Sequence, residues 1–389
     1  MGKPMPLKSN SGKSFQGSIV LGKGFILTPE EAHKLIAKDS RNKEVLFPYL
    51  NGDDLNNSPT QKPSRWVINF FDWSEEKARS YPDCFDIVER LVKPERDSYD
   101  ETKNSWNKSV KTNWWQFGAW RKALERAISE LDQVMVIAEV TKYVSFVLIP
   151  VDLVFMHTLK VISNSDWENI AMLNSSIYAE WAWKYSSTMG SGTLRYTPST
   201  SYETFPFKNI QNSILASVGE KFYYTRKDLM QVVQLGLTDI YNLIHNKKVK
   251  YITREEFEIE EKQFGKTYGK TALKLKKCNT YTNYIYIIQR IEKLRLLIVE
   301  MDRAVVNLYD WSDIELNHSF YELDYLPKND RVRFTIHPSA KKELLKRLLL
   351  LNLQEYHENS MVSNLNKSIS KKGKKVSSII ISNTLFPED

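Results

Sequence analysis

The chain has 389 residues, of which 42% are hydrophobic and 12% aromatic, enough for two or three packed domains. No apolar run is long enough to cross a bilayer, and the first residues lack the hydrophobic stretch of a signal peptide, so we expect a cytoplasmic protein with no membrane partner. Only two cysteines, Cys84 and Cys278, and six scattered histidines are present, a pattern that predicts neither a disulfide nor a zinc site.

The formal net charge of +8 is distributed unevenly along the chain. Residues 1–207 hold 25 Lys and Arg against 25 Asp and Glu, whereas residues 208–389 hold 30 against 22. Five lysines crowd into the Ser-rich segment 359–389, which we expect to be a basic, disordered tail: Lys367, Lys371, Lys372, Lys374 and Lys375. Such a tail either contacts phosphates non-specifically or stays solvated without a partner, so charge alone does not establish DNA binding by the first half.

Short elements of mixed type are predicted in the first third of the chain. Thr28, Pro29 and Glu31 have the spacing of a capped helix start and predict a helix over 29–38. Four further segments are expected to follow: a strand over 65–70, helices over 72–78 and 83–91, and a polar loop over 93–112.

The middle of the chain predicts a sheet flanked by helices. Residues 119–131 have the apolar periodicity of a helix, whose basic residues either face phosphates or are solvated. Four apolar, β-branched runs are expected to form the sheet: 134–140, 143–149, 151–156 and 159–163. A helix capped by Asp166 is expected to extend to about Trp183. Residues 1–207 are therefore predicted to form a mixed α/β domain.

Beyond residue 208 helical patterns dominate, and a helical domain is predicted over 208–358. Apolar residues at alternating spacings of three and four predict a long helix over 282–309 with a coiled-coil-like seam: Tyr284, Ile287, Ile291, Leu294, Ile298, Met301, Val305 and Leu308. The seam closes either on the charged stretch 253–277, as an antiparallel hairpin, or on another chain. A last helix is expected to begin at Pro338 or Ser339.

The segment 181–207 combines aromatic side chains with a loop rich in Ser, Thr and Gly. Lys184, Tyr185 and Arg195 flank this loop, and such a composition suits a chain that follows a phosphate backbone and reaches base edges. The alternative is an aromatic-cornered loop that packs on its own domain.

Several short segments, taken in their order along the chain, resemble those of one protein family. They are GKSFQGS at 12–18, GKGF at 22–25, PYLNGDDL at 48–55, SRWVINF at 64–70, VKPER at 92–96, LRYTP at 194–198, YETFPF at 202–207, LGLTDIYNL at 235–243, MDRAV at 301–305 and YDW at 309–311. Together they resemble the C-terminal half of the type IIG/IIL restriction–modification DNA adenine methyltransferases. The resemblance implies an α+β target-recognition domain followed by a mostly α-helical spacer that clasps double-stranded DNA. The activity of that family is adenine-N6 methylation, often with restriction.

Two loops that an adenine methyltransferase needs are absent from the sequence. One is a Gly-rich strand-to-helix loop for S-adenosylmethionine, and the other is an Asn/Asp-Pro-Pro-aromatic loop for the flipped base. The nearest approach to the second, NSPT at 57–60, lacks the second proline and the ring. We therefore predict no catalytic, cofactor-binding or metal-binding residues in this chain, and we expect S-adenosylmethionine to bind a separate methyltransferase catalytic chain.

The sequence thus predicts a DNA recognition module that is inactive alone. The alternatives are a helical assembly or clamp subunit, whose seam binds another protein, and an inactive truncated remnant. Eight side chains are the predicted DNA contacts, the first three at the loop and the others at phosphates: Lys184, Tyr185, Arg195, Arg65, Lys93, Arg96, Arg121 and Lys142. Most of the nearby tryptophans are expected in the core.

Overall fold

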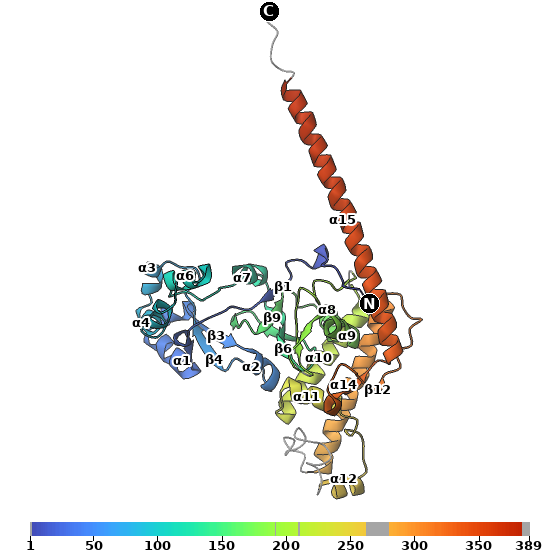
Figure 1. Ribbon diagram of the computed structural model, residues 1–389. Coiled ribbons are helices and arrows are strands. Elements are labelled where there is room, and N and C mark those ends of the chain that lie inside the picture. The colour runs from blue at the N-terminus through green and yellow to red at the C-terminus, as the bar shows by residue number, and fades with distance from the viewer. Residues whose placement is uncertain (1, 191, 209–210, 262–279, 383–389) are drawn as a thin grey trace, which may run out of the picture.

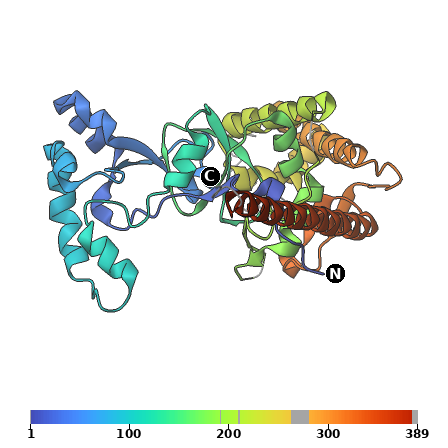
Figure 2. The same ribbon diagram turned by 90° about the horizontal axis from the view of Figure 1, so that it is seen from above.

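The computed structural model describes residues 2–190, 192–208, 211–261 and 280–382. Figure 1 shows an N-terminal lobe, a central body with a helical half beside it, and a long C-terminal helix that extends away from the body. Seen from above in Figure 2, the N-terminal lobe and the helical half lie at opposite ends of the molecule. Within the described residues, every helix is too short or too polar to span a membrane.

The N-terminal lobe is built on the four-stranded sheet β2-β4-β3-β8. Its strands are β2 (Ile26–Leu27), β3 (Leu46–Leu50), β4 (Arg65–Ile68) and β8 (Val154–Phe155). β8 joins β3 in parallel, although about a hundred residues separate them, while the other pairs are antiparallel. The accompanying helices are η2 (Lys23–Phe25), α1 (Pro29–Lys38), η3 (Ser40–Glu44), α3 (Glu75–Arg79), α4 (Pro82–Leu91), α5 (Lys93–Asp97) and α6 (Ser105–Thr112). The helix α2 (Gly52–Asn57) follows β3 but packs on the central body and the helical half, with Leu55 in their core.

Local signals account for most of these short helices. The predicted capping box of α1 is present: the Thr28 hydroxyl accepts a hydrogen bond from the backbone N–H of Glu31, and the Glu31 carboxylate accepts one from the backbone N–H of Thr28. The polar loop predicted over 93–112 is wrong, because α5 and α6 lie there. Pro94 stands in the first turn of α5, and the Asn104 side chain caps α6.

The central body contains the antiparallel sheet β1-β9-β5-β7 and the small sheet β10-β11-β6. The strands are β1 (Ser14–Gln16), β5 (Gln133–Ala138), β6 (Val140–Thr141), β7 (Val147–Pro150), β9 (Leu159–Ile162), β10 (Ser187–Thr188) and β11 (Leu194–Arg195), and the helices are η1 (Lys8–Asn10), α7 (Lys122–Ile128), α8 (Trp167–Asn174) and α9 (Ser176–Tyr185). The single helix predicted after Asp166 is two helices, because Ser175 is extended and caps α9 with its hydroxyl.

The helical half consists of α10 (Ser213–Val233), α11 (Leu237–Ile244), α12 (Arg254–Glu261), α14 (Tyr281–Leu308) and α15 (Pro338–Ser382), with η4 (Lys328–Asp330) in the turn of the hairpin β12 (Ser319–Glu322) and β13 (Val332–Thr335). α14 confirms the long helix predicted over 282–309. Its seam is buried against α10 and also meets α8, α9 and α11 of the same chain. α12 reaches α14 through Phe257, whose ring lies near Tyr281 and Tyr284, whereas 262–277 of the predicted hairpin partner lies outside the described residues.

Two hydrophobic cores divide the molecule differently from the predicted domains. The N-terminal lobe has its own core, which includes Phe25 and Phe70. A second core runs without interruption from the central sheet into the helical half and joins residues such as Val136, Phe222 and Ile291. The boundary predicted between 207 and 208 therefore lies inside one core, so the central body and the helical half support each other.

The described part of the C-terminal segment is helical. Residues 359–382 continue α15, which leaves the body in Figure 1 as one helix. No proline interrupts the sequence between Ser339 and Ser382, so nothing in the backbone forces the helix to end earlier. Residues 383–389 of the predicted tail lie outside the described residues.

Candidate nucleic-acid interface

Arg195 lies on a short strand where its neighbours hold it in place. β11 pairs with β6, which puts Arg195 opposite Val140, next to Glu139 at the end of β5. The Nε of Arg195 donates to the Oε1 of Glu139 over 2.8 Å, while the Arg195 side chain remains 57% exposed. The guanidinium is thus oriented by one carboxylate and still open to solvent, as a DNA-contacting side chain requires.

Lys160 shares the same carboxylate from the buried side. Its Nζ donates to the Oε2 of Glu139 over 2.8 Å, and its side chain is only 9% exposed. Burial alone would raise the pKa of Glu139, but the hydrogen bonds from Lys160 and Arg195 together hold that pKa below its ordinary value. Because Lys160 already neutralises Glu139, Arg195 is able to leave for another acceptor without stranding an unpaired buried charge.

A third cation, Arg121, is connected to this cluster through β1. Its guanidinium donates to the backbone oxygen of Gly17 over 3.3 Å and to the Oε1 of Gln16 over 3.4 Å. Gln16 lies opposite Lys160 on β9 and donates to the backbone oxygen of His157 over 3.0 Å. Arg121, Lys160 and Arg195 therefore lie where β1 ends, β9 begins and β6 pairs with β11, and Glu139 pairs with the last two.

The aromatic residues around the loop pack inward. Trp181, Tyr196 and Phe205 are fully buried, and the hydroxyls of Tyr178 and Tyr196 lie 2.6 Å apart. The tip of the β10–β11 hairpin is exposed from Ser187 to Gly190. The packing interpretation therefore holds for these aromatic side chains, which belong to the core and anchor an exposed hairpin that carries Arg195. The DNA contact of that hairpin stays a prediction.

The other predicted contacts in the central body differ in exposure and in how far their polar groups are already paired within the protein. Lys184 is exposed near the end of α9, and Tyr185 is half-buried with its ring against Trp181. The Nζ of Lys142 lies 2.9 Å from Asp330 and donates to Asn242, so its charge is already paired within the protein. Lys184 is the freer of the two lysines to contact a phosphate.

Two predicted contacts belong to the N-terminal lobe rather than to the Arg195 cluster. Arg65 is exposed at the start of β4, and Lys93 begins α5 with its Nζ 5.0 Å from the ring of Trp114 and 3.7 Å from Glu89. These side chains lie on a lobe with its own core, so they would extend a DNA footprint instead of completing the cluster.

Arg96 is a correction to the sequence prediction. Its side chain is fully buried, and its guanidinium donates to five backbone carbonyls, those of Val20, Leu21, Val110, Asn113 and Gln116. Burial lowers the pKa of Arg96 to about 10. Arg96 as a phosphate partner is therefore wrong: the side chain joins three segments of the N-terminal lobe and has no path to DNA.

We expect Arg96→Met to lower the free energy of unfolding by about 1–3 kcal/mol, because buried carbonyls lose a charged donor. The salt dependence of DNA binding should stay unchanged, since no phosphate contact is removed. Denaturant unfolding and a salt titration of binding measure the two effects. Lys93→Met on the same helix is the matched control for stability only, because Lys93 is itself a predicted phosphate contact. A stable Arg96→Met protein with a reduced salt slope would instead show that Arg96 contacts a phosphate.

Sequence reasoning missed Glu139 and Lys160, which hold Arg195. The available signal was a charged residue next to or within an apolar, β-branched run, at 134–140 for Glu139 and at 159–163 for Lys160. Charged side chains seldom enter buried strands unless they are paired. The antiparallel pairing of β5 with β9, which brings these two residues together, is not visible in a single sequence.

Comparison with known proteins places this geometry in context. Residues 6–209 match the family model described as MmeI, target recognition domain. Among solved structures, that of the type IIL restriction-modification enzyme MmeI in complex with DNA is similar, with 14% sequence identity and a TM-score of 0.45. The similarity covers 76% of this chain and 36% of the MmeI chain, so the present chain spans about a third of that enzyme. No curated protein matches the chain.

Proposed function

Because the chain belongs to the family of MmeI target recognition domains, we propose that it recognises a short sequence in double-stranded DNA as part of a restriction–modification system. The observation that carries this proposal is the exposed guanidinium of Arg195, oriented by Glu139 on a hairpin anchored in the core. An arginine fork held in this way suits the O6 and N7 atoms of a guanine in the major groove.

The cations around Arg195 would fix the register of the duplex. Arg121 lies where β1 ends, Lys184 is exposed beside the hairpin, and Arg65 and Lys93 would extend the contact onto the N-terminal lobe. Phosphate contacts of this kind position a protein on DNA but carry no sequence information, so specificity would depend on the hairpin.

We further propose that the recognised duplex is presented to an adenine-N6 methyltransferase domain. The family resemblance of the sequence supports this step, and S-adenosylmethionine would bind that catalytic domain. We assign no catalytic side chain to the residues that the structure describes. The other candidate, an assembly subunit that uses the seam of α14, loses its support because α10 of the same chain covers that seam.

Selection of bound duplexes from a randomised DNA pool tests the proposal. At about 150 mM salt non-specific phosphate binding is weakened, so we expect one short motif to be enriched. A pool without enrichment, with binding that disappears as salt rises, would contradict sequence recognition. Repeating the selection with Arg195→Ala then shows which position of the motif depends on this side chain.

A further inference from the structure

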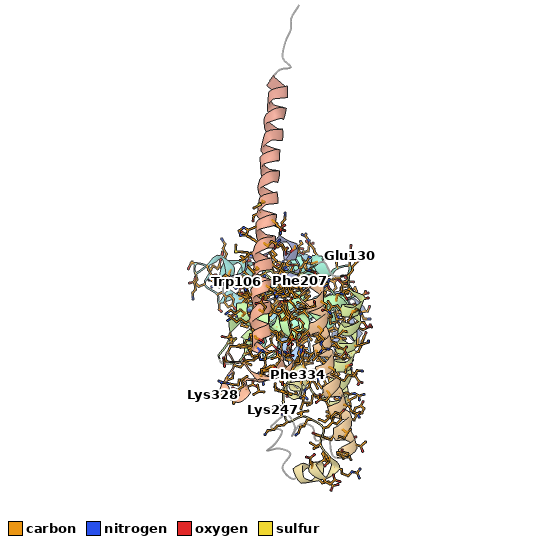
Figure 3. The ribbon with its side chains drawn as sticks, turned by 90° about the vertical axis from the view of Figure 1, so that its right-hand side faces the viewer. Trp106, Glu130, Phe207, Lys247, Lys328 and Phe334 are labelled. Carbon is orange, nitrogen blue, oxygen red and sulfur yellow. The ribbon has the colours of Figure 1, made fainter. Side chains whose placement is uncertain are left out.

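We propose that the turn between β12 and β13 is a positioning element for the hairpin that carries Arg195, so that base discrimination depends on the helical half as well as on the recognition domain. This inference rests on the proposed function. We call residues 323–331 the bracing turn, and residues 187–190 with 192–195 the recognition hairpin. In Figure 3, Lys328 marks the bracing turn at the edge of the body.

The first contact of the bracing turn is with α9, the helix that leads into the recognition hairpin. The hydroxyl of Tyr325 donates to the carboxylate of Glu180, with distances of 3.2 and 3.3 Å to its two oxygens. The Nζ of Lys341 on α15 lies 2.6 Å from the same buried carboxylate. Glu180 therefore joins α9, the bracing turn and α15 at one point.

The second contact is at the tip of the recognition hairpin itself. Gly192 is buried and has a φ of 85°, and a Cβ at this position would lie 2.8 Å from the Cδ of Pro327 and 3.0 Å from its Cγ. The ring of Pro327 thus rests directly on the backbone of Gly192, a distance that only glycine allows. Gly190, on the same tip, also has a positive φ, of 62°, yet its Cβ would meet nothing within 4 Å.

The third contact is on the far side of the recognition hairpin. Asp330 pairs with Lys142 over 2.9 Å and with Arg333 over 3.0 Å. Lys142 directly follows β6, the strand to which β11 and Arg195 are hydrogen-bonded. Asp330 therefore fixes the neighbour strand of the recognition hairpin to the bracing turn.

These three contacts hold the recognition hairpin at its start, its tip and its partner strand. A hairpin of two-residue strands has few hydrogen bonds of its own and would not keep one geometry unaided. A side chain that reads a base edge must be held within about 0.5 Å of its productive place. The bracing turn supplies this restraint before DNA binds, which reduces the ordering that binding would otherwise require.

The matched glycines allow a direct test. Gly192→Ala introduces a side chain that must displace Pro327, whereas Gly190→Ala adds the same methyl group at a positive φ in open space. The measured quantity is the ratio of affinities for the selected duplex and for duplexes with one altered base pair, at several salt concentrations. We expect Gly192→Ala to lower this ratio by at least about fivefold at the pair read by Arg195, the lower end of what one base contact contributes. Gly190→Ala should change it by less than about twofold, and the salt slope should stay unchanged in both.

A double variant distinguishes the loss of hairpin positioning from a general loss of structure. Pro327→Ala removes the ring atoms that the new methyl group meets, so Gly192→Ala combined with Pro327→Ala should recover the discrimination that Gly192→Ala loses. If Gly192→Ala does not fold, the same ratio of affinities is measured for Asp330→Asn, because this change weakens the pair with Lys142. A parent without any sequence preference would overturn the proposed function and this role with it. A parent whose preference survives in Gly192→Ala, or in Asp330→Asn, would overturn the positioning role alone.

Discussion

Arg195→Ala is expected to weaken binding to the selected duplex by about 1–3 kcal/mol if the side chain reads a guanine, with discrimination lost at one base pair. If Arg195 holds a phosphate instead, affinity should fall for all sequences and the salt slope should decrease by about one ion. The fold should tolerate the change, because Lys160 continues to neutralise Glu139 after the guanidinium is removed. Binding titrations of matched and singly altered duplexes at several salt concentrations measure both quantities.

Arg195→Lys distinguishes the two roles more sharply than Arg195→Ala. A lysine keeps the positive charge but loses the planar fork that pairs with guanine O6 and N7. If the guanine contact is correct, Arg195→Lys should lose the base discrimination and keep most of the salt slope. Equal affinity of Arg195→Ala and the parent would remove this residue from the interface.

Elements with strong local signals were predictable from the sequence. The capping box at Thr28 and Glu31 made α1 predictable, and the alternating apolar spacing made α14 predictable. Each pattern involves residues within a few turns of one another. The two cores were not predictable. β8 lies in the middle of the sequence of the central body but pairs with β3 of the N-terminal lobe, a contact that no local pattern encodes.

The same distinction applies to the candidate site. Arg195 and the hydroxyl-rich loop stood out because their composition is local, and the structure places Arg195 on an exposed hairpin. Arg96 is as basic as Arg195 in the sequence, yet it is enclosed by carbonyls from segments up to 76 residues away. Charge and residue type therefore suggest DNA contacts, whereas burial, which depends on the whole fold, decides which of them are free.

Arg226 joins the central body and the helical half through several hydrogen bonds. This α10 residue is only 1% exposed. Its Nη1 donates to Ser145, Asn174 and Tyr241 over 2.8, 3.1 and 3.1 Å, and its Nη2 donates to the backbone oxygen of Phe146 over 2.8 Å. These acceptors come from the segment before β7, from α8 and from α11, so one guanidinium holds together four parts of the shared core.

We expect Arg226→Met to lower the free energy of unfolding by about 1–3 kcal/mol, because several buried acceptors lose their charged donor while the side-chain volume is largely kept. Lys227→Met is the matched control, since Lys227 is the exposed neighbour on the same helix and should change stability by no more than about 0.5 kcal/mol. Denaturant unfolding of the two variants measures the difference. Because Arg226 bonds to the segment before β7 and to α8, its loss should loosen the helical half from the central body. Equal stability of the two variants would mean that apolar burial alone holds the halves together.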